Sequence, residues 1–288
     1  MKRWSLKNGC WLVIALLSVI PAALRAATPQ KAGPPTLAEL LQRLQENLEQ
    51  YDATIPSFFC DEQVVAAMRQ DSVEYWSGLV VTDSTFRLKR VDSSGGRVTL
   101  QESHEVKRVN GRPATGDSVS GPSYLRGAFS NGLALVSLSQ QICMSYTLEP
   151  AAPNRPKDPY IIDFASLPGD QRPINCLMHE DVSGRVLIDP LTTQIKRMEF
   201  RAPHHLIVPA GHLFAKLELA PIYGQWDVSV EYAPILLDGR RFWLPSKIYD
   251  KMASRPADIE WWYNAIYRNY HKMVVTSRIL PFNAALAP

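Results

Sequence analysis

A stripe of leucines with helical spacing opens the patterned part of the chain. The apolar positions that fall on one helix face are Leu37, Leu40, Leu41, Leu44, Leu48 and Tyr51. Thr36-Leu37-Ala38-Glu39 fits a capping box, in which the Thr hydroxyl and the Glu carboxylate satisfy free backbone N–H groups at the helix start. The pattern predicts an amphipathic helix from Leu37 to Tyr51 whose leucine face is buried against another layer.

Extended, β-branched and aromatic segments separated by turn residues dominate the rest of the chain. The predicted strands are residues 58–68, 73–81, 86–91, 98–109, 143–148, 160–164, 175–182, 185–188, 194–202, 228–237, 241–244 and 260–279. Asp83-Ser84 is interpreted as a turn, Asn110-Gly111 as a hairpin turn and Asp238-Gly239 as a type I′ hairpin turn. Residues 123–138 are expected to form a short second helix. These elements predict an α+β fold, with a large antiparallel sheet packed on an N-terminal helix and a second short helix.

The composition supports one globular domain. The chain has 288 residues, of which 46% are hydrophobic and 20% charged, which supplies a core and excludes disordered and collagen-like classes. We expect a disordered leader over residues 27–35, a single β-rich domain over 36–280 and a C-terminal tail over 281–288.

The first 26 residues have the layout of a secretory signal peptide. Residues 1–9 carry three positive charges, and Cys10 to Leu24 form an uncharged apolar run followed by Ala26 and Ala27. This run of 15 residues is shorter than the ~20 needed to span a membrane, and no later stretch is long and apolar enough. We therefore expect an exported protein, periplasmic or extracellular, with no transmembrane segment after cleavage.

The charge balance bears on possible partners. Loss of residues 1–26, which hold four basic residues and no acid, lowers the formal net charge from +3 to −1. A nearly neutral chain gives no electrostatic reason to expect nucleic acid as a partner.

Three cysteines, Cys60, Cys143 and Cys176, remain after cleavage. In an oxidising compartment they allow one disulfide and one free thiol, and their spacing leaves all three pairings open. Because no C-x-x-C motif is present, the odd cysteine is expected to be a buried apolar side chain rather than a nucleophile.

Two groups of residues could support catalysis. Ser118, in Gly116-Asp117-Ser118, would suit a serine hydrolase, but it follows a polar loop and not a supporting strand. His204, His205 and His212 would suit a metal site, but H-E-x-x-H is absent and adjacent residues of an extended chain point to opposite sides. We therefore expect no enzyme activity, no cofactor and no metal, and keep a serine or metal-dependent hydrolase as an alternative.

Aromatic residues crowd the last quarter of the chain. The candidate ligand-binding residues are Trp226, Tyr232, Trp243, Trp261, Tyr263 and Tyr267. On a regular strand, Trp261, Tyr263 and Tyr267 would share one face and Tyr270 would lie on the other. They would either fill the core or line an apolar cavity between the sheet and the Leu40/Leu44 helix.

Three segments carry a resemblance to a known family. They are Ser183–Phe200 (SGRVLIDPLTTQIKRMEF), Asp238–Pro245 (DGRRFWLP) and Tyr267–Lys272 (YRNYHK). The chain resembles exported bacterial proteins of the outer-membrane lipoprotein-sorting (LolA/LolB-like) fold, and uncharacterised secreted bacterial proteins with an early Phe-x-Cys like Phe58-Phe59-Cys60.

This resemblance implies a curved antiparallel half-barrel that wraps helices and encloses a hydrophobic cavity, in a family whose members carry acyl chains or sense lipoproteins. We expect an exported, non-enzymatic binding protein whose partner is a lipid, another apolar ligand, or a lipoprotein or other envelope protein. The alternative outside that class is a structural envelope module with a filled core.

Overall fold

Helix α1 (Leu37–Thr54) begins as the capping box predicts. The backbone N–H of Glu39 donates to Thr36 Oγ1 at 3.3 Å, and the backbone N–H of Thr36 donates to Glu39 Oε2 at 2.7 Å. Four residues of the predicted stripe are buried: Leu40, Leu41, Leu44 and Tyr51. The predicted helix and its buried leucine face are confirmed.

The computed structural model describes residues 34–70, 75–92, 98–115, 127–130, 132–150, 158–207, 222–254 and 259–274. The expected signal peptide, nearly all of the expected leader, Ser118, His212 and the expected C-terminal tail lie outside these residues. From Pro35 on, the chain belongs to one compact unit.

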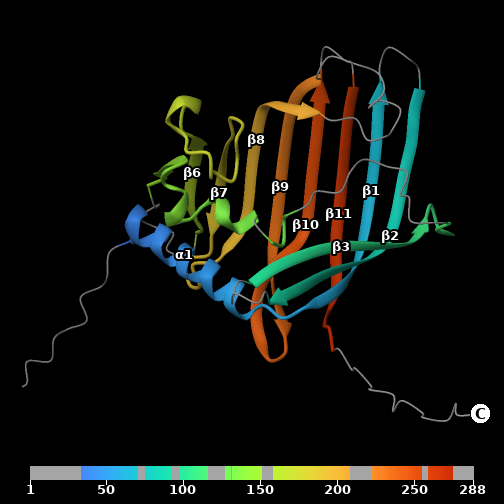
Figure 1. The fold of residues 1–288 in the computed structure, drawn as a ribbon, viewed down its shortest axis with the longest axis horizontal. Coiled ribbons are helices and arrows are strands. Elements are labelled where there is room, and N and C mark those ends of the chain that lie inside the picture. Colours follow the sequence, from blue (N-terminus) through green and yellow to red (C-terminus); the bar gives the residue numbers. More distant parts are fainter. Residues whose placement is uncertain are drawn as a thin grey trace, which may run out of the picture. The chain divides into compact units, whose positions relative to one another are not determined.

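Eleven strands form one antiparallel sheet (Figure 1). Its first four strands are β1 (Phe58–Gln70), β2 (Tyr75–Asp92), β3 (Val98–Val109) and β4 (Arg112–Pro113). The others are β5 (Met144–Leu148), β6 (Tyr160–Ser166), β7 (Ser183–Ile188), β8 (Ile195–Ile207), β9 (Ile222–Leu237), β10 (Arg240–Ser254) and β11 (Ile259–Lys272). The order is β4-β3-β2-β1-β11-β10-β9-β8-β7-β6-β5, so the sheet does not close. The predicted large antiparallel sheet beside one long helix is confirmed.

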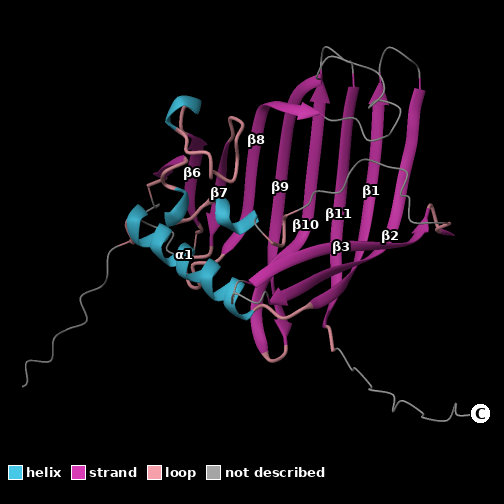
Figure 2. Ribbon diagram, in the orientation of Figure 1, coloured by secondary structure: helices cyan, strands magenta, loops and turns pink. Residues whose placement is uncertain are grey.

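The predicted second helix is wrong. Between residues 127 and 141 the described chain contains two short 3₁₀ turns, η1 (Gly132–Leu135) and η2 (Leu138–Gln140) (Figure 2). Gly127 has φ +89°, and Ser137, between the turns, is extended with φ −150° and ψ 162°. Neither conformation belongs to an α-helix, so none can pass through these positions.

Several predicted strand boundaries are also wrong, since β9 and β10 are longer than predicted and two segments were assigned incorrectly. β2 runs straight through Asp83-Ser84, because both residues pair with β1 and a register shift against β3 absorbs the irregularity. Residues 175–182 form no strand; this segment holds Cys176, and the Glu180 carbonyl accepts a hydrogen bond from Arg172. The two hairpins are confirmed, since Asn110, Gly111, Asp238 and Gly239 all have positive φ, as type I′ turns require.

We call the side of the sheet whose side chains are buried with α1 the inner face. Phe58, Phe86, Leu88 and Leu244 lie there and are fully buried together with the α1 leucines. The ring of Phe129 stacks on Phe86 with centroids 4.2 Å apart. This cluster fixes α1 against the sheet.

No helix in the part of the chain that the structure describes is long and apolar enough to cross a membrane.

Candidate functional site

A cavity of about 390 Å³ lies between α1 and β10. From α1 it is lined by Leu44, Asn47, Leu48, Gln50, Tyr51 and Thr54. Leu133 of η1, Gln194 and Ile195 at the start of β8, and the β10 residues 240–243 complete the lining. Its volume falls within the range of ~300–1,000 Å³ typical of small-molecule pockets.

The cavity has an apolar floor. Leu44, Ile195 and Phe242 are buried, and Leu48 and Leu133 are half-buried. Tyr51 contributes its ring to the cavity lining. Its hydroxyl donates to the backbone carbonyl of Phe129 at 2.7 Å and is therefore already satisfied. Burial raises the pKa of Tyr51 well above its usual value, so this side stays uncharged.

The polar side chains of the cavity come from both sides, Asn47, Gln50 and Thr54 from α1 and Gln194, Arg240 and Arg241 from the sheet. Asn47 Nδ2 donates to the carbonyl of Thr193 at 2.8 Å and so holds the middle of the helix to the β7–β8 turn. The Thr54 hydroxyl donates to the carbonyl of Gln50 at 2.7 Å. The described lining contains no Asp, Glu, His, Cys or Ser.

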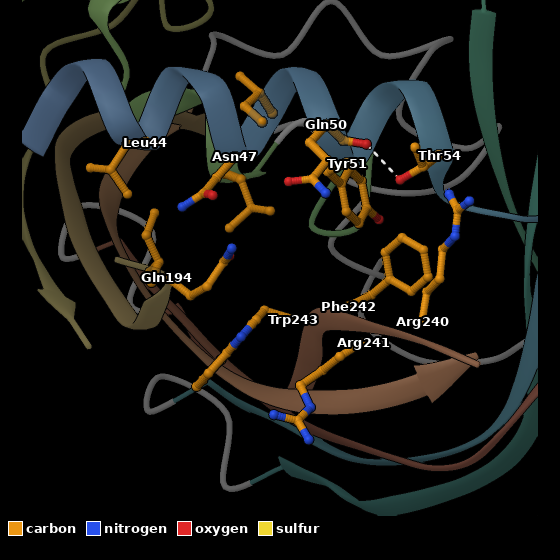
Figure 3. A pocket seen from close by; sticks show the side chains of 13 residues that line it. Leu44, Asn47, Gln50, Tyr51, Thr54, Gln194, Arg240, Arg241, Phe242 and Trp243 are labelled. Carbon is orange, nitrogen blue, oxygen red and sulfur yellow. Dashed lines mark hydrogen bonds between the residues drawn. The ribbon is translucent and has the colours of Figure 1, made fainter. Parts of the chain in front are cut away.

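The Asp238-Gly239 turn decides which β10 side chains face the cavity. Because successive strand residues point to opposite faces, Arg240 and Phe242 share one side and Arg241 and Trp243 the other. Figure 3 shows Arg240 and Phe242 pointing toward α1, whereas Arg241 and Trp243 point away from it.

Of the six aromatic residues predicted to bind a ligand, only Trp243 lies at this cavity. Trp243 borders it, but its side chain points away. Trp261 and Trp226 lie in one row across β11, β10 and β9, since both pair with Met252. Tyr232, Tyr263 and Tyr267 are buried on the inner face. None of these last five residues lines the cavity between α1 and β10.

Tyr270 does not lie on the face opposite Tyr267, as strand alternation would predict. Its ring packs against Phe58 with centroids 5.6 Å apart, and its hydroxyl donates to the carbonyl of Pro245. A register shift between β1 and β11, next to Asn269 at φ +56°, inserts one residue and turns Tyr270 into the core.

A group of polar residues, of which Asp250 is buried and His205 and Glu180 are half-buried, lies around Trp226. Its Nε1–H donates to Asp250 Oδ1 at 2.7 Å, and the ring of His205 packs on the indole with centroids 4.4 Å apart. His205 Nδ1 lies 2.8 Å from a carboxylate oxygen of Glu180. Burial raises the pKa of Asp250 to about 7, and the hydrogen bond from Trp226 lowers this pKa by a smaller amount.

Of the predicted histidine group, the structure describes His204 and His205, and His212 lies outside the described residues. His205 contacts Glu180 and Trp226, while His204 is exposed. Within the described ranges no three His, Cys, Asp or Glu side chains are placed to hold a metal ion.

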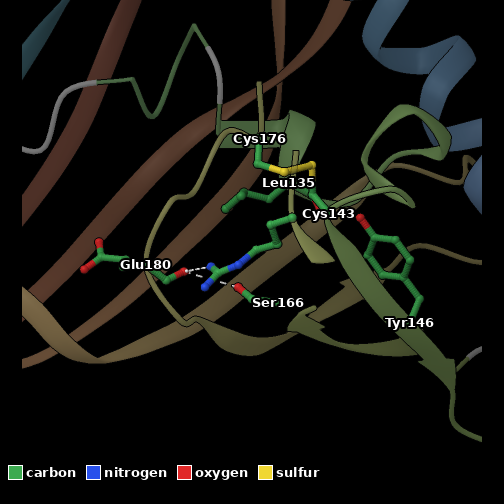
Figure 4. Close-up of a disulfide and its surroundings, with 7 residues drawn as sticks. Leu135, Cys143, Tyr146, Ser166, Cys176 and Glu180 are labelled. Atoms are coloured by element: carbon green, nitrogen blue, oxygen red, sulfur yellow. Dashed lines mark hydrogen bonds between the residues drawn. A yellow bond between two sulfur atoms is a disulfide. The ribbon is translucent and has the colours of Figure 1, made fainter. Parts of the chain in front are cut away.

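Cys143 and Cys176 form a disulfide, with Cα atoms 5.7 Å apart (Figure 4). Cys60 is a buried free thiol whose pKa burial raises far above its usual value. The expected division into one bridge and one buried thiol is confirmed, and the structure selects one of the three pairings that spacing left open.

Sequence reasoning missed Leu48, Phe242 and Arg240 as cavity residues. Leu48 was assigned to the helix stripe, and Arg240 directly follows the recognised Asp238-Gly239 turn. These residues form a cavity because α1 lies over β10. Local sequence patterns do not show that this helix and this strand are neighbours.

Comparison with known proteins gives a likeness of fold only. No family model matches the chain, and no curated protein matches it. Four chains among the solved structures match. One is a DUF1329 family protein from Desulfovibrio piger, 12% identical, over 81% of this chain and 92% of that chain, with a TM-score of 0.37. Membership of the lipoprotein-sorting family is not confirmed.

Proposed function

We propose that the protein is an exported binding protein that holds the apolar chain of a lipid or similar ligand between α1 and β10. The observation that carries this proposal is the cavity itself, with a floor of Leu44, Ile195 and Phe242 and polar groups toward solvent. An apolar floor beneath a polar rim suits a ligand with one apolar end and one polar end.

Burial of apolar surface would supply the affinity. Each methylene group moved from water onto the floor contributes about 0.8 kcal/mol. Tyr51 adds an aromatic face whose hydroxyl is already satisfied by the Phe129 carbonyl, so covering it leaves no orphaned donor. The site thus offers room for a chain of several methylene groups next to polar side chains of α1 and β10.

The finer part of the proposal comes from the sequence. The resemblance to lipoprotein-sorting proteins implies a half-barrel with an acyl-chain cavity, and residues 1–26 have the layout of an export signal. We therefore propose an envelope or extracellular lipid carrier or sensor.

Native mass spectrometry of the mature protein, purified from an exported form without detergent, tests the proposal. We expect extra mass that organic extraction identifies as lipid. Leu48→Trp, which fills the cavity, should abolish the extra mass while the protein remains folded by circular dichroism.

Arg43→Trp is the matched control, because it adds the same side chain to an exposed α1 position outside the cavity. It should retain the lipid. A bare mass for the unmodified protein, together with no binding of added dodecanoate, would overturn the proposal. Equal lipid loss in both Trp variants would place the ligand elsewhere.

A further inference from the structure

Arg240 leaves a positive charge unbalanced at the edge of the cavity. Its side chain is exposed, and it has no ion-pair partner among the described residues. Asp238, two residues earlier, is paired with Lys272. Asp52, near the end of α1, lies in the field of Arg90, which also donates to the Asp52 carbonyl at 2.6 Å. Asp238 is therefore matched with another cation, and neither Asp238 nor Asp52 forms an ion pair with Arg240 among the described residues.

The position of Arg240 relates this charge to the apolar floor. Arg240 and Phe242 point the same way from β10, two residues apart, which corresponds to about 7 Å along a strand. Figure 3 shows the Arg240 side chain extending from β10 toward the C-terminal end of α1, where Thr54 also lines the cavity. A ligand chain lying on Phe242 would therefore place its first polar atoms beside this guanidinium.

We infer that the ligand is an amphiphile with an anionic head group, a carboxylate or a phosphate, which pairs with Arg240. A guanidinium presents a fork of N–H donors that matches both groups, and charge-assisted hydrogen bonds are stronger than neutral ones. This inference rests on the proposed function, since it assumes that the chain occupies the cavity.

A structural role for Arg240 makes a different prediction. The last turn of α1 has no basic residue. In a purely structural role, Arg240 would offset the partial negative charge at this end of the helix and bind no ligand. In that case its loss would lower the melting temperature and leave the affinity for different head groups unchanged.

Three amphiphiles with the same dodecyl chain test the inference by isothermal titration calorimetry below their micelle concentrations. They are dodecanoate, dodecylphosphocholine and dodecyltrimethylammonium, with anionic, zwitterionic and cationic heads. We expect dodecanoate to bind at least tenfold more tightly than dodecyltrimethylammonium, with a preference that weakens as salt is raised. Dodecyl phosphate in place of dodecanoate then distinguishes phosphate from carboxylate.

Arg240→Gln should weaken dodecanoate binding about tenfold and leave dodecyltrimethylammonium within twofold. Arg43→Gln is the matched control, because it removes the same charge from an exposed α1 position outside the cavity. Equal binding of all three amphiphiles would overturn the head-group inference while keeping the proposed function. Equal losses in the two variants would also overturn it, and no binding of any amphiphile would overturn both.

Discussion

Asp250 is a buried carboxyl group whose burial is only partly compensated. It accepts one hydrogen bond, from Trp226, and its pKa rises from 3.8 to about 7. Below pH 4 the group is protonated in both the folded and unfolded states. As pH rises toward 7 the unfolded state loses the proton first, so the free energy of unfolding falls, and above pH 7 this contribution levels off.

Asp250→Asn should remove this pH dependence. In urea denaturation, the free energy of unfolding of the variant relative to that of the natural protein should rise between pH 4 and pH 7, by an amount on the order of a few kcal/mol. A difference between the two proteins that stays constant over this range would show that Asp250 is ionised in the folded state.

Glu102 holds the loop that carries Phe129 into the core. Its carboxylate accepts hydrogen bonds from the backbone N–H groups of Gly127, Phe129 and Ser130, at 2.8, 3.0 and 2.8 Å. Glu102→Ala should lower the free energy of unfolding by roughly 3 kcal/mol, because it orphans these donors. The control is Glu105→Ala on the same strand, which breaks an exposed pair with Arg87 and should cost less than about 1 kcal/mol. Equal costs for the two variants would contradict this role.

At the scale of residues, the sequence predicts those features, such as helix caps and tight turns, that depend only on neighbouring residues. The Thr36–Glu39 box and the Asp238-Gly239 turn are set within four residues, and both are correct. Tyr270 is different, because one inserted residue against β1 reverses its face. That insertion depends on the partner strand, about 200 positions away.

At the scale of elements, the Cys143–Cys176 disulfide ties the start of β5 to the irregular segment before β7. It closes a loop over a sequence separation of 33 residues. Such a loop is expected to stabilise the protein by roughly 3–4 kcal/mol through loss of unfolded-state entropy. Reduction with dithiothreitol should therefore lower the melting temperature by several degrees.

Two variants separate the bridge from the free thiol. Cys143→Ser with Cys176→Ser should reproduce the lowered midpoint and abolish the response to dithiothreitol. Cys60→Ala should keep the full response, because Cys60 is not bridged. A midpoint that dithiothreitol leaves unchanged would exclude a stabilising bridge.

The sequence predicts an element boundary correctly only where the side-chain pattern and the backbone geometry agree. Asp83-Ser84 is a typical turn pair, yet β2 continues through it, since neighbours on both sides satisfy its backbone and Gln63 donates to the Asp83 carboxylate at 3.0 Å. Residues 132–138 have helical composition, but Ser137 is extended and the turns stay 3₁₀.

For the whole molecule, the decisive contact joins the first strand to the last. Phe58 pairs with Lys272, and the β1–β11 ladder brings the N-terminal segment next to the aromatic quarter. Periodicity predicted a sheet and a helix to cover it, but the order of the strands depends on such distant pairings. The cavity is a product of that order, because it forms where α1 passes over β10.

The most direct test of the binding function is a crystal structure of the mature protein with dodecanoate. The account predicts electron density for the chain between Leu48 and Phe242, with the carboxylate at Arg240. Density over Trp226 and Tyr263 instead, with the space between α1 and β10 empty, would contradict it.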